Sequence, residues 1–494
     1  MEKSNGSIIA LAGGAMIATC LFGAPANAES DIAAKRSAVI EYWTAARRAA
    51  AQPRDMVIDH RGLGYLRRAD GSLQPHGHTL QAEVQGQPVP RAKPGSGGGD
   101  TEAPNISNLN PDGATIGFAY EFSAVITDNT GLRSVKFIIS KNGGLPQSFT
   151  PTSNGDAWTI SLSGFTDGSW SWEVEAKDSA KGGGNLATAS ASFTVDTAGG
   201  GGSSGGGGGT GDTLINEMWT GGGDVQRATG RLFYEMPSNP RRKRWAGYVC
   251  SGTVVTDGAT GRSVILTASH CVYDDANNAF ARNVLFIPDQ HHTSGTRTDS
   301  NCDNDPIGCW VADFGVVDVN WTTSEFPSNK AWDYGFYVVS DSGAHRAGLT
   351  SAPSALDAAV NEMTVDFTSP DVNDGAAGAG TPDFTHGMGY SYSDDPYFMY
   401  CAEDMTTEGS DNWWLPSCEL SGGSSGGPWF QPLNESNGNG PVISVNSWGY
   451  TTSAGMAGPI LSGTSAQCVF DAAIIRDFPS NPIDGDAGYA VNCQ

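Results

Sequence analysis

Residues 422–430, Gly-Gly-Ser-Ser-Gly-Gly-Pro-Trp-Phe, are the stretch that decides the fold of this 494-residue chain. The glycines around Ser425 predict a tight backbone turn that presents the serine hydroxyl and lets another chain approach closely. A serine hydroxyl is a weak nucleophile at neutral pH, so it needs an imidazole to take its proton and a carboxylate to orient that imidazole. Because Gly- and Ser-rich stretches are also typical of flexible loops, the presence of those partners decides the interpretation.

Two further stretches supply the partners. His270 lies in Leu-Thr-Ala-Ser-His-Cys-Val (266–272), after an apolar run that predicts a buried strand, and Asp333 heads another apolar run in Trp-Asp-Tyr-Gly-Phe-Tyr-Val-Val (332–339). A single His beside a Cys is commonly structural, and a single Asp is commonly a turn residue. The three residues in the order His, Asp, Ser, each beside a β-branched run, instead indicate a nucleophile with its base and its orienting acid.

These motifs resemble the chymotrypsin/trypsin-like serine proteases over residues 212–494. The resemblance implies a mainly β fold with a double six-stranded antiparallel β-barrel, and an endopeptidase with a Ser425 acyl-enzyme intermediate. Two other acids, Asp313 and Asp318, are rivals for the orienting role. Trp-Asp-Tyr-Gly followed by an apolar run is closer to the family motif, so the resemblance favours Asp333.

The resemblance assigns further roles. The backbone N–H groups of Gly423 and Ser425 would form the oxyanion hole, which stabilises the negative charge that develops during acyl transfer. Ser447-Trp448-Gly449 resembles the edge strand on which these enzymes bind substrate as an added antiparallel strand. An ordinary core strand with a buried tryptophan is the alternative.

Three positions depart from the family. Ser424 stands where vertebrate trypsin-like enzymes have the Asp that pairs with a new N-terminus, so latency must arise differently. Glu419 falls, by counting, at the trypsin specificity position, where a buried acid would favour Arg or Lys before the cut. Because the position of Cys418 is shifted relative to trypsin, it is equally open that Glu419 is an exposed carboxylate in a loop. Asn446 stands where bacterial glutamyl endopeptidases, which the chain also resembles, usually have His, and this counts against Glu specificity.

The cysteines predict a disulfide framework. All of them except Cys20 lie between residues 250 and 493, and an even number on an exported chain indicates disulfides. The trypsin-like resemblance implies Cys250–Cys271. Order along the chain suggests the rest, namely Cys302–Cys309, Cys401–Cys418 and Cys468–Cys493. No spacing resembles a structural zinc site.

Composition limits the partners and the compartment. The formal net charge of −25 disfavours nucleic acid and anionic membranes. Residues 1–28 have the apolar run and the Ala26-Asn-Ala28 ending of a signal peptide, so we expect an exported protein, extracellular or periplasmic. A membrane anchor and a lipoprotein through Cys20 are weaker alternatives. We expect polypeptide substrates, no membrane span and a monomer.

The remaining sequence divides into segments. Residues 29–93 predict a pro-region with an amphipathic helix (Ile32, Val39, Ile40, Trp43 and Ala50 on one face) ended by Pro53, and its excess of basic residues suits an acidic enzyme. It would inhibit the enzyme, assist folding, or simply remain attached. Residues 94–101 and 198–211 are Gly-rich linkers. Between them, 102–197 alternate apolar and polar residues in short runs, which predicts a β-sandwich similar to bacterial Ig-like or fibronectin type III modules.

Two further features leave alternatives open. Arg241–Arg244 is either a processing site or a charged hairpin turn between two predicted strands. The acidic stretches 299–305 and 371–374 suit calcium, although solvated loops are the simpler interpretation. The proposed catalysis needs no metal, so we expect no cofactor.

Overall fold

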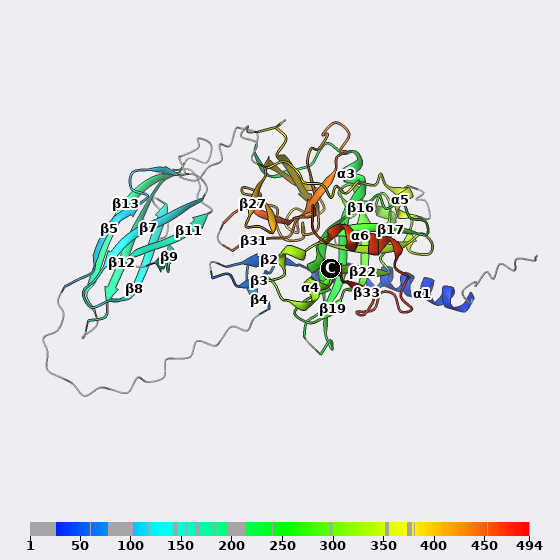
Figure 1. The fold of residues 1–494 in the computed structure, drawn as a ribbon, viewed down its shortest axis with the longest axis horizontal. Helices are drawn as coiled ribbons and strands as arrows, with labels where there is room; N and C mark the ends of the chain where they lie inside the picture. Colours follow the sequence, from blue (N-terminus) through cyan, green and yellow to red (C-terminus); the bar gives the residue numbers. More distant parts are fainter. Residues whose placement is uncertain are drawn as a thin grey trace, which may run out of the picture.

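The computed structural model describes residues 26–59, 61–77, 102–116, 119–141, 147–154, 156–163, 168–180, 184–195, 213–239, 241–296, 299–350, 355–372, 378–379, 381–451 and 453–493. The fold is mainly β, as predicted (Figure 1). Residues 1–25, which hold most of the expected signal peptide, and both expected linkers lie outside the described residues. No helix of the described part is long and apolar enough to cross a membrane.

Residues 105–195 form two sheets that share one apolar core. Phe122, Phe137, Trp172 and Phe193 are buried between the sheets, in keeping with the alternating pattern of the sequence. One sheet has the strand order β10-β11-β7-β5 and the other β6-β13-β12-β8-β9. The bounds are β5 Asn105–Asn110, β6 Thr115–Ile116, β7 Ala119–Thr127, β8 Leu132–Lys141, β9 Gln147–Phe149, β10 Thr152–Asn154, β11 Ala157–Ser163, β12 Gly168–Asp178 and β13 Leu186–Val195.

The first half of the candidate protease region is built on a 10-stranded sheet with the order β24-β21-β20-β15-β16-β17-β23-β22-β33 and with β1 paired to β16. Both strands predicted to open this region are present, as β15 and β16, and Arg241–Arg244 lies in the connection between them. The bounds are β1 Gln52–Pro53, β15 Thr229–Pro237, β16 Trp245–Val255, β17 Arg262–Thr267, β20 Arg282–Pro288, β21 Cys309–Val311, β22 Phe314–Asp318, β23 Gly335–Ser340, β24 His345–Arg346 and β33 Gly488–Val491.

The second half contains two sheets, with orders β14-β26-β25-β29-β30 and β27-β28-β32-β31-β2-β3-β4. The N-terminal segment contributes β1 to the sheet of the first half and β2, β3 and β4 to a sheet of the second half. The bounds are β2 Asp55–Ile58, β3 Gly64–Arg67, β4 Leu73–Pro75, β14 Leu214–Met218, β25 Phe384–Gly389, β26 Met399–Asp404, β27 Thr406–Glu408, β28 Asn412–Leu415, β29 Pro428–Phe430, β30 Val442–Val445, β31 Trp448–Tyr450 and β32 Met456–Pro459.

The predicted N-terminal helix is two helices. α1 ends at Tyr42, and Thr44 caps α2, whose amide at Arg47 bonds to the threonine hydroxyl. This break leaves Val39, Ile40 and Trp43 buried but turns Ala50 outward, so placing Ala50 on the apolar face was wrong. The bounds are α1 Ala26–Tyr42, α2 Ala45–Ala50, α3 Gly223–Ala228, α4 Val319–Thr323, α5 Leu356–Ala359 and α6 Ala466–Ile475, with the short hairpin β18 Tyr273–Asp274 and β19 Ala279–Phe280.

Four disulfides tie the candidate protease region together. They join Cys250–Cys271, Cys302–Cys309, Cys401–Cys418 and Cys468–Cys493, the sequential pairing expected from the sequence. The first links β16 to the turn that carries His270.

Candidate active site

His270 lies in a single 3-10 turn, Ser269–Cys271, directly after β17. The buried run of β17 ends there, and the turn is held from two sides. Cys271 is bonded to Cys250, and the Ser269 hydroxyl donates to the Tyr334 carbonyl at 2.7 Å. The imidazole is fully buried, so its orientation depends on the groups that surround it.

Asp333 supplies the orientation. Its Oδ2 lies 2.7 Å from His270 Nδ1, and its Oδ1 accepts the main-chain N–H of His270 at 2.8 Å. The Ser447 hydroxyl also donates to Oδ2, at 2.5 Å. With the carboxylate on Nδ1, the proton resides on that nitrogen and Nε2 is the free acceptor. Among the described residues Nε2 has no hydrogen-bond partner.

The two rival acids lie in other contacts. Asp313 accepts both Nε and Nη2 of Arg36 from α1 at 2.7 Å, and its second oxygen accepts the Ser340 amide at 2.9 Å. Asp318 caps α4 by accepting the Asn320 amide at 2.7 Å. The structure therefore brings Asp333, of the three candidates, to the imidazole.

Ser425 lies on the turn between β28 and β29 and is nearly buried. Its carbonyl accepts the Ser251 amide at 2.7 Å, and the Ser251 hydroxyl donates to the Gly423 carbonyl at 2.9 Å. Gly426 has a φ of +78°, and a Cβ there would lie 2.0 Å from the Thr267 hydroxyl, so glycine is required. The Ser425 hydroxyl donates to the carbonyl of Arg54 at 3.5 Å, and not to His270.

The main-chain amides of Gly423 and Ser425 are the donors expected to form the oxyanion hole. Within the described part of the chain neither donates to another protein group. Gly423 adopts a φ of +99°, which only glycine does readily. Two free amides beside a serine hydroxyl can stabilise a developing oxyanion.

Asn446 is a functional candidate whose role was not predicted. It is fully buried; its Nδ2 donates to the carbonyls of Met388 (2.7 Å) and Ser424 (3.0 Å), and its Oδ1 accepts Trp429 Nε1 at 2.7 Å. Its main chain also pairs with Gly426 and Gly427 at 2.8 Å. Asn446 therefore holds the turn that carries Ser425.

Of the three expected substrate-binding residues on the edge strand, Ser447 turns its hydroxyl to Asp333, and Trp448 is buried. β31 bears β2 of the N-terminal segment on its edge, as a parallel neighbour. The expected position for an added strand is therefore occupied by this chain itself.

Glu419 is partly exposed, and its amide donates to the Ile215 carbonyl at 2.8 Å. Partial burial raises the pKa of its carboxyl. No printed contact joins Glu419 to Ser425 or His270, so its expected role in specificity stays a prediction.

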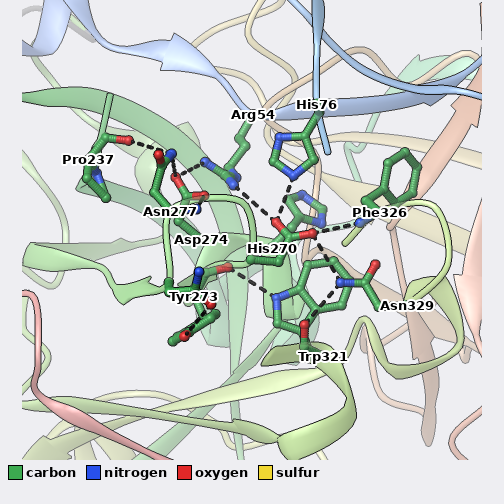
Figure 2. A network of polar contacts seen from close by, with 12 residues as sticks. Arg54, His76, Pro237, His270, Tyr273, Asp274, Asn277, Trp321, Phe326 and Asn329 are labelled. Atoms are coloured by element: carbon green, nitrogen blue, oxygen red, sulfur yellow. Dashed lines mark hydrogen bonds and ion pairs between the residues drawn. The ribbon is translucent and has the colours of Figure 1, made fainter. Parts of the chain in front are cut away.

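Four residues form a polar network that sequence reasoning missed, part of which Figure 2 shows. Arg54 and His76 from the N-terminal segment reach Asp274 and Asp275, just after the His270 turn. Two adjacent acids so close to the His motif were the available signal. Beside the network, a cavity of about 1020 Å³ lies between the N-terminal segment and the loop after His270.

The described residues bring three potential metal ligands together at one place, Cys250, His270 and Cys271. Both cysteines are disulfide-bonded there, so their sulfurs are not thiolates. Asp374 lies outside the described residues, and the calcium expectation stays a prediction.

Comparison with known proteins gives limited similarity. No family model and no curated protein matches the chain. Among solved structures, the VesB protease of Vibrio cholerae is 11% identical over 50% of this chain and 64% of its own, with a TM-score of 0.30. An endo-beta-1,4-mannanase from Thermotoga petrophila (16% identity, 20% of each chain, TM-score 0.17) and CopC from Methylosinus trichosporium OB3b (13%, 19% of this chain and 93% of its own, 0.16) also match. This chain thus spans about a fifth of the mannanase and under two thirds of the protease. Similarity at this level carries no argument about activity.

Proposed function

We propose that residues 212–494 are a secreted serine endopeptidase of the chymotrypsin/trypsin-like class, with His270, Asp333 and Ser425 as its catalytic residues. The observation that carries the proposal is the pair of hydrogen bonds that Asp333 accepts from the imidazole and the main chain of His270. That arrangement leaves Nε2 as the acceptor that a serine hydroxyl needs.

The proposal includes the two-barrel fold. Its support is the location of the three residues, since His270 and Asp333 come from the 10-stranded sheet region and Ser425 from the sheets of the second half. A site at the junction of two halves is a common location for a catalytic cleft. Export is also part of the proposal, because four disulfides are typical of proteins that fold in an oxidising compartment.

The chemistry follows from the residues. The Ser425 hydroxyl gives its proton to His270 Nε2 while its oxygen bonds to the peptide carbonyl carbon. Asp333 stabilises the imidazolium, and the amides of Gly423 and Ser425 hold the oxyanion. The imidazolium then protonates the leaving amine as the C–N bond breaks. Water, activated by the same imidazole, hydrolyses the acyl-enzyme and restores Ser425.

Casein hydrolysis tests the function. Protein is folded as the full chain, the chain is cut before residue 102, and the released segment is removed by high salt and gel filtration. Rates are then compared for the wild type, Ser425→Ala and the exposed control Ser436→Ala. We expect digestion by the wild type and the control and its loss in Ser425→Ala. Equal rates in all three, or none, would contradict the proposal. Hydrolysis of simple esters without peptides would indicate an esterase, and neither activity would indicate a binding protein with this fold.

A further inference from the structure

Residues 52–58 of the N-terminal segment, called the cleft segment below, cross the proposed active site. Gln52 and Pro53 pair with Tyr248 and Val249 of β16, and Met56–Ile58 pair with Trp448–Tyr450 of β31. Between these two pairings, the Arg54 carbonyl accepts the Ser425 hydroxyl at 3.5 Å. A Cβ on Gly422 would lie 2.5 Å from the Asp55 Cβ, so the segment lies directly on the Ser425 turn.

The direction of the cleft segment is opposite to that of a substrate. β2 runs parallel to β31, whereas a substrate strand on the Ser447–Gly449 edge of such an enzyme is expected to be antiparallel. The contact of Arg54 with the Ser425 hydroxyl is through the Arg54 carbonyl oxygen, at 3.5 Å. In the described part of the chain the amides of Gly423 and Ser425 do not bind that oxygen. The segment therefore covers the nucleophile without offering it a peptide bond in reactive geometry.

Arg54 is the polar anchor of the segment. Its side chain is about 1% exposed, with Nη1 3.5 Å from Asp274 Oδ2 and Nη2 3.9 Å from Asp275 Oδ1, and with the Tyr248 ring 5.5 Å from its Cζ. Among the described residues its Nε and Nη2 have no hydrogen-bond partner. The guanidinium is thus buried beside two carboxylates, and Figure 2 shows it directed toward Asp274.

The Asp275 carboxylate is held in place by hydrogen bonds and faces side chains of the N-terminal segment. It accepts the Phe326 amide at 2.8 Å and Asn329 Nδ2 at 3.1 Å, and His76 Nε2 lies 2.7 Å from its other oxygen. Burial alone would raise the pKa of this carboxyl, but His76, Arg54 and the Phe326 amide together lower it to about 2. Asp275 is therefore charged at neutral pH, and two cationic or polar side chains of the N-terminal segment cover it.

Apolar contacts complete the interface. Met56, Ile58 and Leu66 pack with Trp448 and Phe326 in one cluster. A Cβ on Gly64 would lie 2.6 Å from the Phe326 ring, so the hairpin of β2 and β3 is closely fitted.

We propose that the cleft segment is an inhibitory strand that binds the active site in the reverse direction, and that the Asp274–Asp275 pair is the guanidinium-binding site that locks it there through Arg54. This inference rests on the proposed endopeptidase function. It explains how latency arises in a chain that has Ser424 in place of the trypsin-like Asp.

The experiment uses the full chain with a recognition sequence for a site-specific protease inserted at residues 94–101. The protein folds intact and is then cut, so the segment remains in place only if its contacts hold it. Labelling of Ser425 by a fluorophosphonate is followed in the wild type, Arg54→Ala, Arg54→Lys and Asp275→Asn. Arg47→Ala is the matched control, because Arg47 lies on α2 of the N-terminal segment, outside the cleft segment, and is exposed.

We expect slow labelling in the wild type and the control while the cut segment stays bound in gel filtration. Truncating a buried charge pair commonly weakens an interface by a factor of about 30 or more. Labelling of Arg54→Ala and Asp275→Asn should therefore rise at least about 30-fold as the segment dissociates, with a smaller rise in Arg54→Lys. Wild-type labelling as fast as that of Arg54→Ala would overturn the proposal and leave the endopeptidase function intact.

Mass spectrometry tests the direction. Reverse binding predicts that the bond between Arg54 and Asp55 stays intact on long incubation. Cleavage there by the wild type but not by Ser425→Ala would overturn it.

If Arg54→Ala does not fold, the wild-type complex provides the test. We then expect labelling of Ser425 to increase when the cut segment is removed by high salt. If labelling does not change in protein that hydrolyses casein, inhibition by the segment is refuted. Protein that neither labels nor hydrolyses casein after removal of the segment refutes the proposed function itself.

Discussion

Asp333 makes three hydrogen bonds, and the one to His270 Nδ1 has the largest expected effect on rate. Asp333→Asn keeps the shape but removes the charge and favours the wrong imidazole tautomer. We expect kcat to fall by a factor of about 10⁴, as for this change in a comparable triad. Peptide hydrolysis by the processed enzyme measures the effect, with Asp303→Asn, an exposed acid, as the control. A drop of less than tenfold would mean that Asp333 is not the orienting acid.

Ser447 contributes to the same carboxylate. Ser447→Ala removes a hydrogen bond to a charged acceptor, worth about 1.5–3 kcal/mol. If the hydroxyl positions Asp333, kcat should fall by roughly 10- to 150-fold with KM unchanged. Ser447→Thr retains the hydroxyl and should recover part of the rate. A lower melting temperature with unchanged kcat would instead show a merely structural role.

At the scale of elements, α1 is attached to the candidate protease region by the buried pair of Arg36 and Asp313. Arg36→Met leaves Asp313 buried and unpaired, which typically costs about 3–5 kcal/mol. We expect a clear fall in the precursor's free energy of unfolding, measured by urea denaturation. Lys35→Met is the matched control, since Lys35 is exposed on the same helix. Equal stability of the two variants would contradict the anchoring role.

β26 contains a buried acid, Glu403, whose charged form is destabilised in the folded protein. Burial raises the pKa of Glu403 from the ordinary 4.5 to about 7, against the hydrogen bonds from Ser417. Between these pH values the unfolded state loses the proton while the folded state keeps it, so stability falls as pH rises, by about 3 kcal/mol in total.

Glu403→Gln removes that titration and keeps an acceptor for Ser417. We expect the variant to match the wild type near pH 4 and to exceed it in stability at pH 8. Thermal unfolding at both pH values measures the difference. Glu217→Gln, an exposed substitution on β14 that keeps Glu403, is the control and should follow the wild type at both pH values. If the difference in stability between the wild type and Glu403→Gln is the same at both pH values, the raised pKa of Glu403 is refuted.

At the scale of the whole molecule, the sandwich takes all of its strands in the described part of the chain from residues 105–195. Phe137→Ala removes a buried ring whose centroid lies 5.0 Å from that of Trp172. Such a change lowers the free energy of unfolding by about 3–5 kcal/mol. We expect the calorimetric transition of the sandwich to move down while peptide hydrolysis stays unchanged. A parallel loss of hydrolysis would show that the two parts depend on each other.

Local sequence was sufficient where neighbours along the chain decide the outcome. The strands before His270 and after Asp333, the glycine-lined turn of Ser425 and the alternating strands of the sandwich each follow from patterns a few residues long. The two-helix start was missed because a threonine cap inside an apolar periodic run is a weak signal.

Tertiary structure decided what depends on residues far apart in sequence. Asp313, Asp318 and Asp333 all precede or end apolar runs. The family motif favoured Asp333, which does reach His270, but only packing shows that Asp313 binds Arg36. Packing also decides that Asn446 holds the turn that carries Ser425, and that β2 pairs with β31 as a parallel strand. A sequence pattern specifies a strand's alternating faces, but not its neighbour or its direction, because those are set by non-local contacts.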